Sequence, residues 1–188
     1  ELPRETEFIG SGVSYCATCD GAFFRGKAVA VVGGGNTAVQ DALYLERFAS
    51  EIYIIHRRDE LRATKILAER IKASQKVHIL WDSAIKSLEG ENKLSSIKLV
   101  NLKTKAESEI AVNGLFVAIG QVPSTSFAEI DKDNNGYILT QDDMSTNIAG
   151  VFAAGDLRHK PLRQVVTACA DGAIAAESAS KWLVEENR

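Results

Sequence analysis

The glycine cluster Gly33-Gly34-Gly35 constrains the fold more than any other feature, because of what stands on either side of it. The segment "KAVAVVGGG", residues 27 to 35, is an apolar, β-branched run that ends in the glycines. The segment "NTAVQDALYLERF" follows at once, with Ala38, Ala42 and Leu45 at helical spacing. A buried strand, a tight turn and a helix in this order are typical of an α/β fold built on a parallel sheet.

Within this turn, Gly33, Gly35 and Ala38 match the pattern G-x-G-x-x-A. The first residue permits the tight turn, the second lets backbone N–H groups approach a pyrophosphate, and the small third residue lets helix and strand pack closely. The helix N-terminus then faces the anion. The alternative is a glycine-rich turn without a ligand, and the strand that follows the helix favours the nucleotide-binding interpretation.

Strand and helix patterns alternate along the rest of the chain. We expect a second strand "EIYIIHRR" from Glu51, a second helix "ELRATKILAERIKAS" from Glu60, a third parallel strand "VHILW", an antiparallel hairpin over residues 93 to 112, and a buried strand "GLFVAIG" over residues 114 to 120. A linker is predicted near residues 121 to 126, followed by a short strand "GVFAAGD" and a final helix from about Leu162 to Val184. This order predicts a Rossmann-like α/β domain with an antiparallel β-meander.

The second strand ends in "HRRDELR", where many dinucleotide-binding proteins carry an acidic residue for the ribose hydroxyls. Here the side chains are His56, Arg57 and Arg58, with Arg62 one helical turn further on. Guanidinium groups form charge-assisted hydrogen bonds to phosphate. The alternative is a solvated basic start of a helix, but the position after the glycine turn favours NADPH over NADH.

Cys16 and Cys19 stand two residues apart in "SYCATCDGAFF", with Asp20 directly after them. A structural zinc site needs four ligands, and the third cysteine, Cys169, is far away in the sequence, so no metal site is expected. A purely structural disulfide would close a very short loop. A redox pair stores the two electrons of a hydride, Asp20 could exchange the proton, and a flavin should sit between nicotinamide and disulfide.

Composition excludes several other classes of protein. The formal charge of −3 offers no basic footprint for nucleic acid, and no apolar run is long enough to span a membrane. The first residues, "ELPRETEFIGSG", lack the pattern of a secretory signal and read as a chain cut into partway. Three cysteines in 188 residues fit an intracellular protein rather than a secreted disulfide scaffold.

Six motifs in order, "CATCDG", "GGGNTAVQDALYL", "HRRDELRA", "GLFVAIGQVPST", "GVFAAGD" and "RQVVTACADGAIAA", resemble those of the bacterial-type, low-molecular-weight thioredoxin reductases. The resemblance implies electron transfer from NADPH through FAD and a CxxC pair to thioredoxin, in a cytoplasmic homodimer. It implies catalytic roles for Cys16, Cys19 and Asp20. It also implies cofactor contacts by Gly33, Gly34, Gly35, Asn36, Thr37, Ala38, His56, Arg57, Arg58, Arg62, Ile119, Gly120, Asp156, Arg163, Gln164 and Val165.

The resemblance further divides the chain into an NADPH-binding domain, residues 1 to 122, and the C-terminal part of a split FAD-binding domain, residues 123 to 188. The N-terminal FAD half of such an enzyme, with its own glycine fingerprint, has no counterpart here, so we expect no FAD retention and no turnover by this chain alone. Two alternatives stay open: the flavoprotein subunit of an alkyl hydroperoxide reductase, which would use NADH, and a non-catalytic nucleotide-binding module.

Two more expectations concern cysteine state and surface. We expect a disulfide between Cys16 and Cys19 in the oxidised protein, and a free, mostly buried thiol at Cys169. In the second part of the chain we expect exposed apolar faces at Val151, Phe152, Val165, Ile174 and Trp182.

Overall fold

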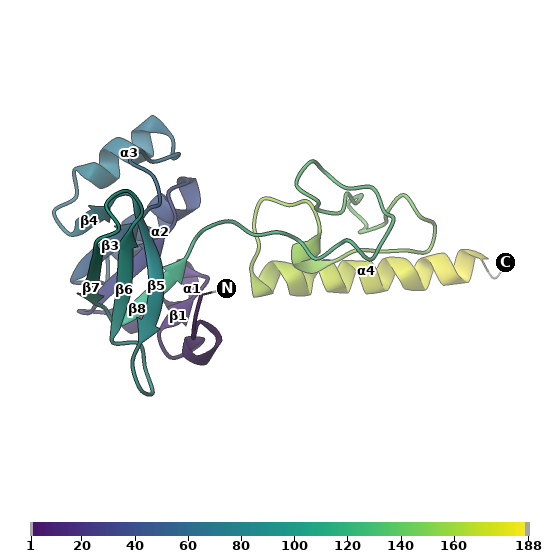
Figure 1. Cartoon of the computed structure of the whole chain (residues 1–188). Helices are drawn as coiled ribbons and strands as arrows, with labels where there is room; N and C mark the ends of the chain where they lie inside the picture. The colour runs from purple at the N-terminus through teal and green to yellow at the C-terminus, as the bar shows by residue number, and fades with distance from the viewer. Residues whose placement is uncertain (1, 187–188) are drawn as a thin grey trace. The chain divides into compact units, whose positions relative to one another are not determined.

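The computed structural model describes residues 2–186 and divides into two compact units, Glu1–Gly120 and Gln121–Arg188 (Figure 1). The sequence places its linker at the same point, directly after "GLFVAIG". None of the helices in the described residues is long and apolar enough to cross a membrane.

A five-stranded parallel sheet forms the framework of the first unit. Its strands, in spatial order, are β1 (Val13–Ser14), β8 (Gly114–Val117), β2 (Ala28–Val32), β3 (Glu51–Ile55) and β4 (Val77–Leu80). All four neighbouring pairs are parallel. The apolar, β-branched runs seen in the sequence are the central strands, as expected for strands covered on both faces. The predicted α/β class is confirmed.

Helices cover one face of this sheet. They are α2 (Asn36–Leu45) and α3 (Lys65–Lys72). The short α1 (Ala17–Asp20) and the 3-10 turn η2 (Gly21–Phe24), which precede α2 in the chain, pack against α2. On the strands, Val29, Ile52 and Phe116 belong to the core on this face, together with fully buried Ala38 and Leu45 of α2. The spacing of small residues in α2 lets the helix lie close to the strands.

A three-stranded antiparallel sheet covers the other face, with strand order β5 (Ser83–Glu89), β6 (Ser96–Asn101), β7 (Glu107–Ala111) (Figure 1). Ala30 and Leu115 of the parallel sheet pack here against Leu88 and Ile97. The 3-10 turn η1 (Thr6–Phe8) adds Phe8 to the same core. The predicted hairpin is confirmed as β6 and β7, whereas β5 was not identified from the sequence.

The second helix begins later than the sequence suggests. Helical spacing extends from Glu60, but α3 starts at Lys65. The preceding residues are held by contacts outside the segment: the Arg62 N–H donates to the Gly34 carbonyl at 2.7 Å, and the Thr64 N–H donates to Asn36 Oδ1 at 2.8 Å. These bonds replace the helical ones that the local pattern favours.

The second unit contains the 3-10 turn η3 (Gly155–Leu157), the long helix α4 (Val165–Glu186) and connecting segments. The prediction of a strand at "GVFAAGD" is wrong, because within the described residues Phe152 forms only an isolated bridge with Ser145. The prediction of a final helix is confirmed. A strand needs a partner ladder, and the local apolar pattern alone does not supply one.

Candidate functional site

The three glycines after β2 are needed for different reasons. Gly33 has a φ of +150°, and a Cβ there would collide with the Ala118 carbonyl oxygen. A Cβ on Gly34 would collide with the His56 ring. Around Gly35, by contrast, no atom of the described residues beyond its immediate neighbours in the chain and helix lies within 4 Å of where a Cβ would be. The chain itself requires glycine at 33 and 34, while at 35 it leaves bare backbone facing open space.

The N-terminus of α2 opens onto that space. Gly35 is its N-cap residue and no side chain caps the first turn. The Asn36 side chain is engaged elsewhere, by the Thr64 N–H, and Thr37 is exposed. Uncapped N–H groups and the positive end of the helix dipole together form a site suited to a phosphate group.

Three exposed arginines, Arg57, Arg58 and Arg62, lie on the segment tied to this turn by the Arg62–Gly34 backbone bond. Within residues 2–186 none of them forms an ion pair. Of the two acidic residues of the segment, Asp59 is paired with Lys103 of the β6–β7 connection at 2.8 Å, and Glu60 is exposed. Lys103 also reaches Asp82 at 3.1 Å. With Asp59 paired to Lys103, the three arginines outnumber the remaining carboxylate, Glu60, so the loop presents net positive charge beside the open helix end.

His56 occupies a different position from the arginines. It is 4% exposed, its ring packs against Gly34, and its Nε2 lies 3.0 Å from the Glu60 carbonyl. Burial, together with the neighbouring arginine charges, lowers the pKa of His56, although the bond to Glu60 acts in the opposite direction. The ring supports the glycine turn from behind, whereas the sequence grouped it with the arginines.

Cys16 and Cys19 form a disulfide, as predicted. Cys16 is the N-cap residue of α1, and its sulfur accepts a hydrogen bond from the Cys19 N–H at 3.2 Å. Cys19 is exposed, so a reductant or a second disulfide can reach the pair from solvent. The thiol at Cys169 is free but exposed on α4, which corrects the expectation that it would be mostly buried.

Asp20 follows Cys19 at the end of α1 and is held by Ser14 of β1. The Ser14 hydroxyl donates to Asp20 Oδ2 at 2.7 Å and accepts from the Cys16 N–H at 3.1 Å. Ser14 is 5% exposed. One buried hydroxyl thus connects the carboxylate to the backbone of the redox turn.

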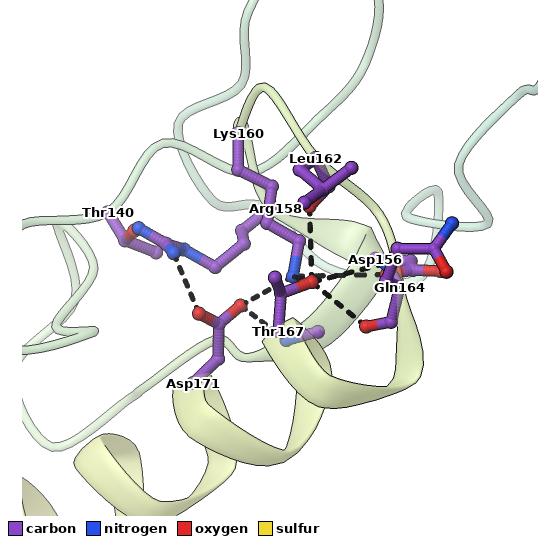
Figure 2. A network of polar contacts seen from close by, with 9 residues as sticks. Thr140, Asp156, Arg158, Lys160, Leu162, Gln164, Thr167 and Asp171 are labelled. Atoms are coloured by element: carbon purple, nitrogen blue, oxygen red, sulfur yellow. Dashed lines mark hydrogen bonds and ion pairs between the residues drawn. The ribbon is translucent and has the colours of Figure 1, made fainter.

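In the second unit, a polar network holds the turn that carries Asp156 (Figure 2). Asp171 of α4, 7% exposed, accepts from the Gly155 N–H at 3.1 Å and pairs with Lys160 at 2.8 Å and with Arg158 at 3.1 Å. Arg158 also donates to Thr140 Oγ1 at 2.9 Å. Burial acts to raise the pKa of Asp171, but these donors and charges outweigh it and hold the pKa below its usual value.

The network borders a cavity of about 370 Å³ in the same unit, lined by Gln121, Val122, Pro123, Ser124, Tyr137, Asp156 and Leu157. The Arg163 guanidinium lies 3.8 Å over the Tyr137 ring, and its buried Nε has no hydrogen-bond partner among the described residues. Gln164 is half-buried and Val165 is 81% exposed. In the first unit, Ile119 after β8 is 70% exposed, and Gly120 has a φ of +109°.

The residues present fit the two cofactors expected from the sequence. The open space at Gly35, the uncapped helix end and the unpaired arginines suit a phosphorylated nucleotide. The cavity beside Asp156 and the orphaned Arg163 N–H leave room and a donor for a second ligand.

Nothing in the sequence singles out Ser14, because a serine that ends a short strand is an ordinary residue. The lone acid Asp171 within the apolar helix "VVTACADGAIAA" was a usable signal for a buried ion pair.

The apolar surface of the second unit agrees in part with expectation. Val165 is exposed, as is Ile174 at 42%. Val151, Phe152 and Trp182 are half-buried, which corrects the expectation for these three. Trp182 lies against Gly150, where a Cβ would approach its ring to about 2.8 Å.

Known proteins similar to this chain in sequence and structure include thioredoxin reductases. The chain is 50% identical over 189 residues to a thioredoxin reductase of Peptoclostridium acidaminophilum, covering 96% of this chain and 60% of the relative. It is 49% identical to that of Bacillus subtilis, covering 98% of this chain and 59% of the relative. The crystal structure of a thioredoxin reductase from Streptococcus pyogenes has a TM-score of 0.91 at 45% identity, over 98% of this chain and 61% of that one.

The resemblance seen in the motifs is therefore confirmed, and the chain spans about 60% of the length of these curated relatives. The family model described as pyridine nucleotide-disulphide oxidoreductase matches residues 1–172. With its glycine turn, open helix end and disulfide already in place, the chain belongs to the pyridine nucleotide-disulphide oxidoreductase family.

Proposed function

We propose that this chain is the NADPH-binding and disulfide-bearing part of a thioredoxin reductase. The observation that carries the proposal is the presence, in one unit, of an accessible Cys16–Cys19 disulfide and a phosphate-type turn flanked by three unpaired arginines. The domain division follows: residues 1 to 122 bind the nucleotide, and residues 123 to 188 contribute to an FAD site. We place the enzyme in the cytoplasm as a homodimer, as the resemblance implies.

The residues of the glycine turn orient the nucleotide. The uncapped N–H groups at the start of α2 bind the pyrophosphate, and Gly35 lets it approach the backbone. Arg57, Arg58 and Arg62 bind the 2′-phosphate, since bidentate guanidinium contacts suit its geometry. Lys103 keeps the Asp59 carboxylate occupied, so that it does not repel that phosphate.

The disulfide and Asp20 carry the second half of the reaction. A bound FAD would supply the two-electron chemistry that connects the nicotinamide with the disulfide. Reduction breaks the S–S bond and leaves two thiols, and Asp20 exchanges a proton with them. The exposed Cys19 then presents the reduced pair to the disulfide of thioredoxin. Asp156, Arg163, Gln164 and Val165 belong to the proposed FAD contacts, along with Ile119 and Gly120.

Cofactor preference tests the proposal directly. Isothermal titration of the chain with NADPH and with NADH should show tighter binding of NADPH by about tenfold or more, because each charge-assisted hydrogen bond contributes about 1.5–3 kcal/mol. Equal affinities would contradict the assignment, and tighter NADH binding would favour the alkyl hydroperoxide reductase flavoprotein. We expect the chain alone not to retain FAD after dialysis, and a yellow, stoichiometric complex would contradict that expectation.

A further inference from the structure

We propose that Ser14 is a positioning residue for the redox pair: its buried hydroxyl fixes the Asp20 carboxylate relative to the turn that carries Cys16 and Cys19. The proposal rests on the proposed disulfide chemistry and adds to it a residue outside the CxxC motif. Ser14 lies five residues before Cys19, on a different element, β1, so the motif itself gives no reason to single it out.

The hydrogen-bond geometry assigns one role to each atom of the hydroxyl. Ser14 has one hydroxyl proton and gives it to Asp20 Oδ2 at 2.7 Å, the shortest of its contacts. Its oxygen accepts from the Cys16 N–H at 3.1 Å. The Cys16 carbonyl, 3.4 Å away, is the weaker of the two possible acceptors. The hydroxyl therefore links the carboxylate to the backbone of the residue whose sulfur caps α1.

Burial and strand pairing make this link rigid. Ser14 is 5% exposed, so water does not compete well for the hydroxyl. Ser14 also pairs with Phe116 of β8, a residue of the core. The Asp20 side chain is thus held in place by a residue of the parallel sheet, and not only by the four-residue helix α1 to which Asp20 belongs.

The second carboxylate oxygen is left for chemistry. Within residues 2–186, Asp20 Oδ1 has no hydrogen-bond partner, while Oδ2 is engaged by Ser14. Reduction of the disulfide takes up two electrons from NADPH and two protons. The S–S bond breaks and both sulfurs are reduced to thiols; one proton derives from the hydride of NADPH, and Oδ1 of the protonated carboxyl delivers the other and is protonated again from water. Ser14 binds Oδ2 in both protonation states of the carboxyl, because that oxygen remains an acceptor.

The test uses the full chain in a Cys169→Ala background, reduced beforehand, with the rate of iodoacetamide alkylation of Cys16 and Cys19 followed against pH. A nearby carboxylate disfavours the thiolate, so Asp20→Asn should lower the pH midpoint of alkylation by about half a unit or more. Ser14→Ala should also lower the pH midpoint, because a carboxylate that is no longer held in place disfavours the thiolate less strongly. The double variant should match Asp20→Asn alone.

Two matched comparisons keep the outcome clear. Ser14→Thr retains the hydroxyl and should behave like the parent, whereas Ser14→Val, of similar size, should behave like Ser14→Ala. Ser11→Ala removes a half-buried serine of the same segment, whose hydroxyl donates to the Glu7 carbonyl at 3.4 Å and not to Asp20, and should change nothing. Circular dichroism verifies folding, and the Thr and Val pair decides the question if the Ala variant unfolds.

Three results would overturn the proposal: a Ser14→Ala or Ser14→Val midpoint equal to that of the parent, shifts that add to that of Asp20→Asn, or the same shift in Ser14→Thr. The measurement needs neither NADPH nor thioredoxin. A failure of the nucleotide assignment would therefore be seen in titration, and a failure of the Ser14 assignment in alkylation, independently of each other.

Discussion

The two units of the chain are stabilised in different ways. In the first, the parallel sheet is covered on both faces, and Val29, Ile54 and Leu115 are completely buried. In the second, among the described residues, the buried apolar side chains are Ile138, Met144 and Ala153, while Val165 and Val166 of α4 are exposed. There a buried ion-pair network connects Asp171 of α4 with Arg158 and Lys160 of the preceding segment. The first unit has a core of its own, and the second depends on a few polar contacts.

The largest expected difference is in core truncation. Ile54→Ala should destabilise the first unit by about 4 kcal/mol, because it leaves a cavity in a fully buried site. Ile174→Ala on α4 should cost less than about 1 kcal/mol, since that side chain is 42% exposed. Urea unfolding can separate the units through Trp81 and Trp182, each studied with the other changed to Phe. Equal losses would remove the contrast.

Asp171→Ala should destabilise the second unit by about 3 kcal/mol, because it leaves Lys160 and Arg158 buried without their partner. The effect should appear in the Trp182 signal and not in that of Trp81. Asp142→Ala, which removes an exposed carboxylate from the same unit, is the control. A loss spread over both signals would show that the units do not unfold separately.

Nucleotide selectivity should reside in the first unit. Arg57→Ala combined with Arg58→Ala should reduce NADPH affinity by about a hundredfold and leave NADH affinity within about threefold, since about 2.7 kcal/mol is a modest estimate for two lost charge-assisted bonds. Arg70→Ala removes the same charge from the exposed side of α3 and is the control. Titration calorimetry gives both affinities, and parallel losses for the two nucleotides would disprove a 2′-phosphate site.

A smaller effect concerns pH. Asp41 of α2 has no hydrogen-bond or ion-pair partner among the described residues, and burial raises its pKa to about 6. Its neutral form is favoured in the folded chain, so its contribution to stability is full below about pH 4 and is lost as pH rises through 6. Asp41→Asn should stabilise the first unit at pH 7.5 by about 1 kcal/mol, after allowance for partial exposure. Glu91→Gln, on the exposed surface, should not, and urea midpoints at pH 5 and 7.5 measure the difference.

The sequence predicts best where local pattern and tertiary contact agree. The apolar runs of β2, β3 and β8 are buried on both faces, so their pattern is unambiguous. It fails where a distant contact decides, as at Arg62, whose N–H bonds to Gly34 and delays the start of α3. Ser14 could not be predicted, because its importance comes from a bond to Asp20 six residues away, on another element.

The place of β8 in the sheet has a consequence for folding order. This strand lies between β1 and β2, although it is the last strand of its unit in the chain. Val13 pairs with Leu115, so β1 lacks its neighbour until the chain has been made past that residue. Contacts this distant in sequence form late, because the loop between them must close first. During synthesis, Cys16 and Cys19 are therefore made long before β8, the strand that pairs with β1 next to them. Both thiols are exposed to the surrounding redox conditions before the folded structure around them has formed.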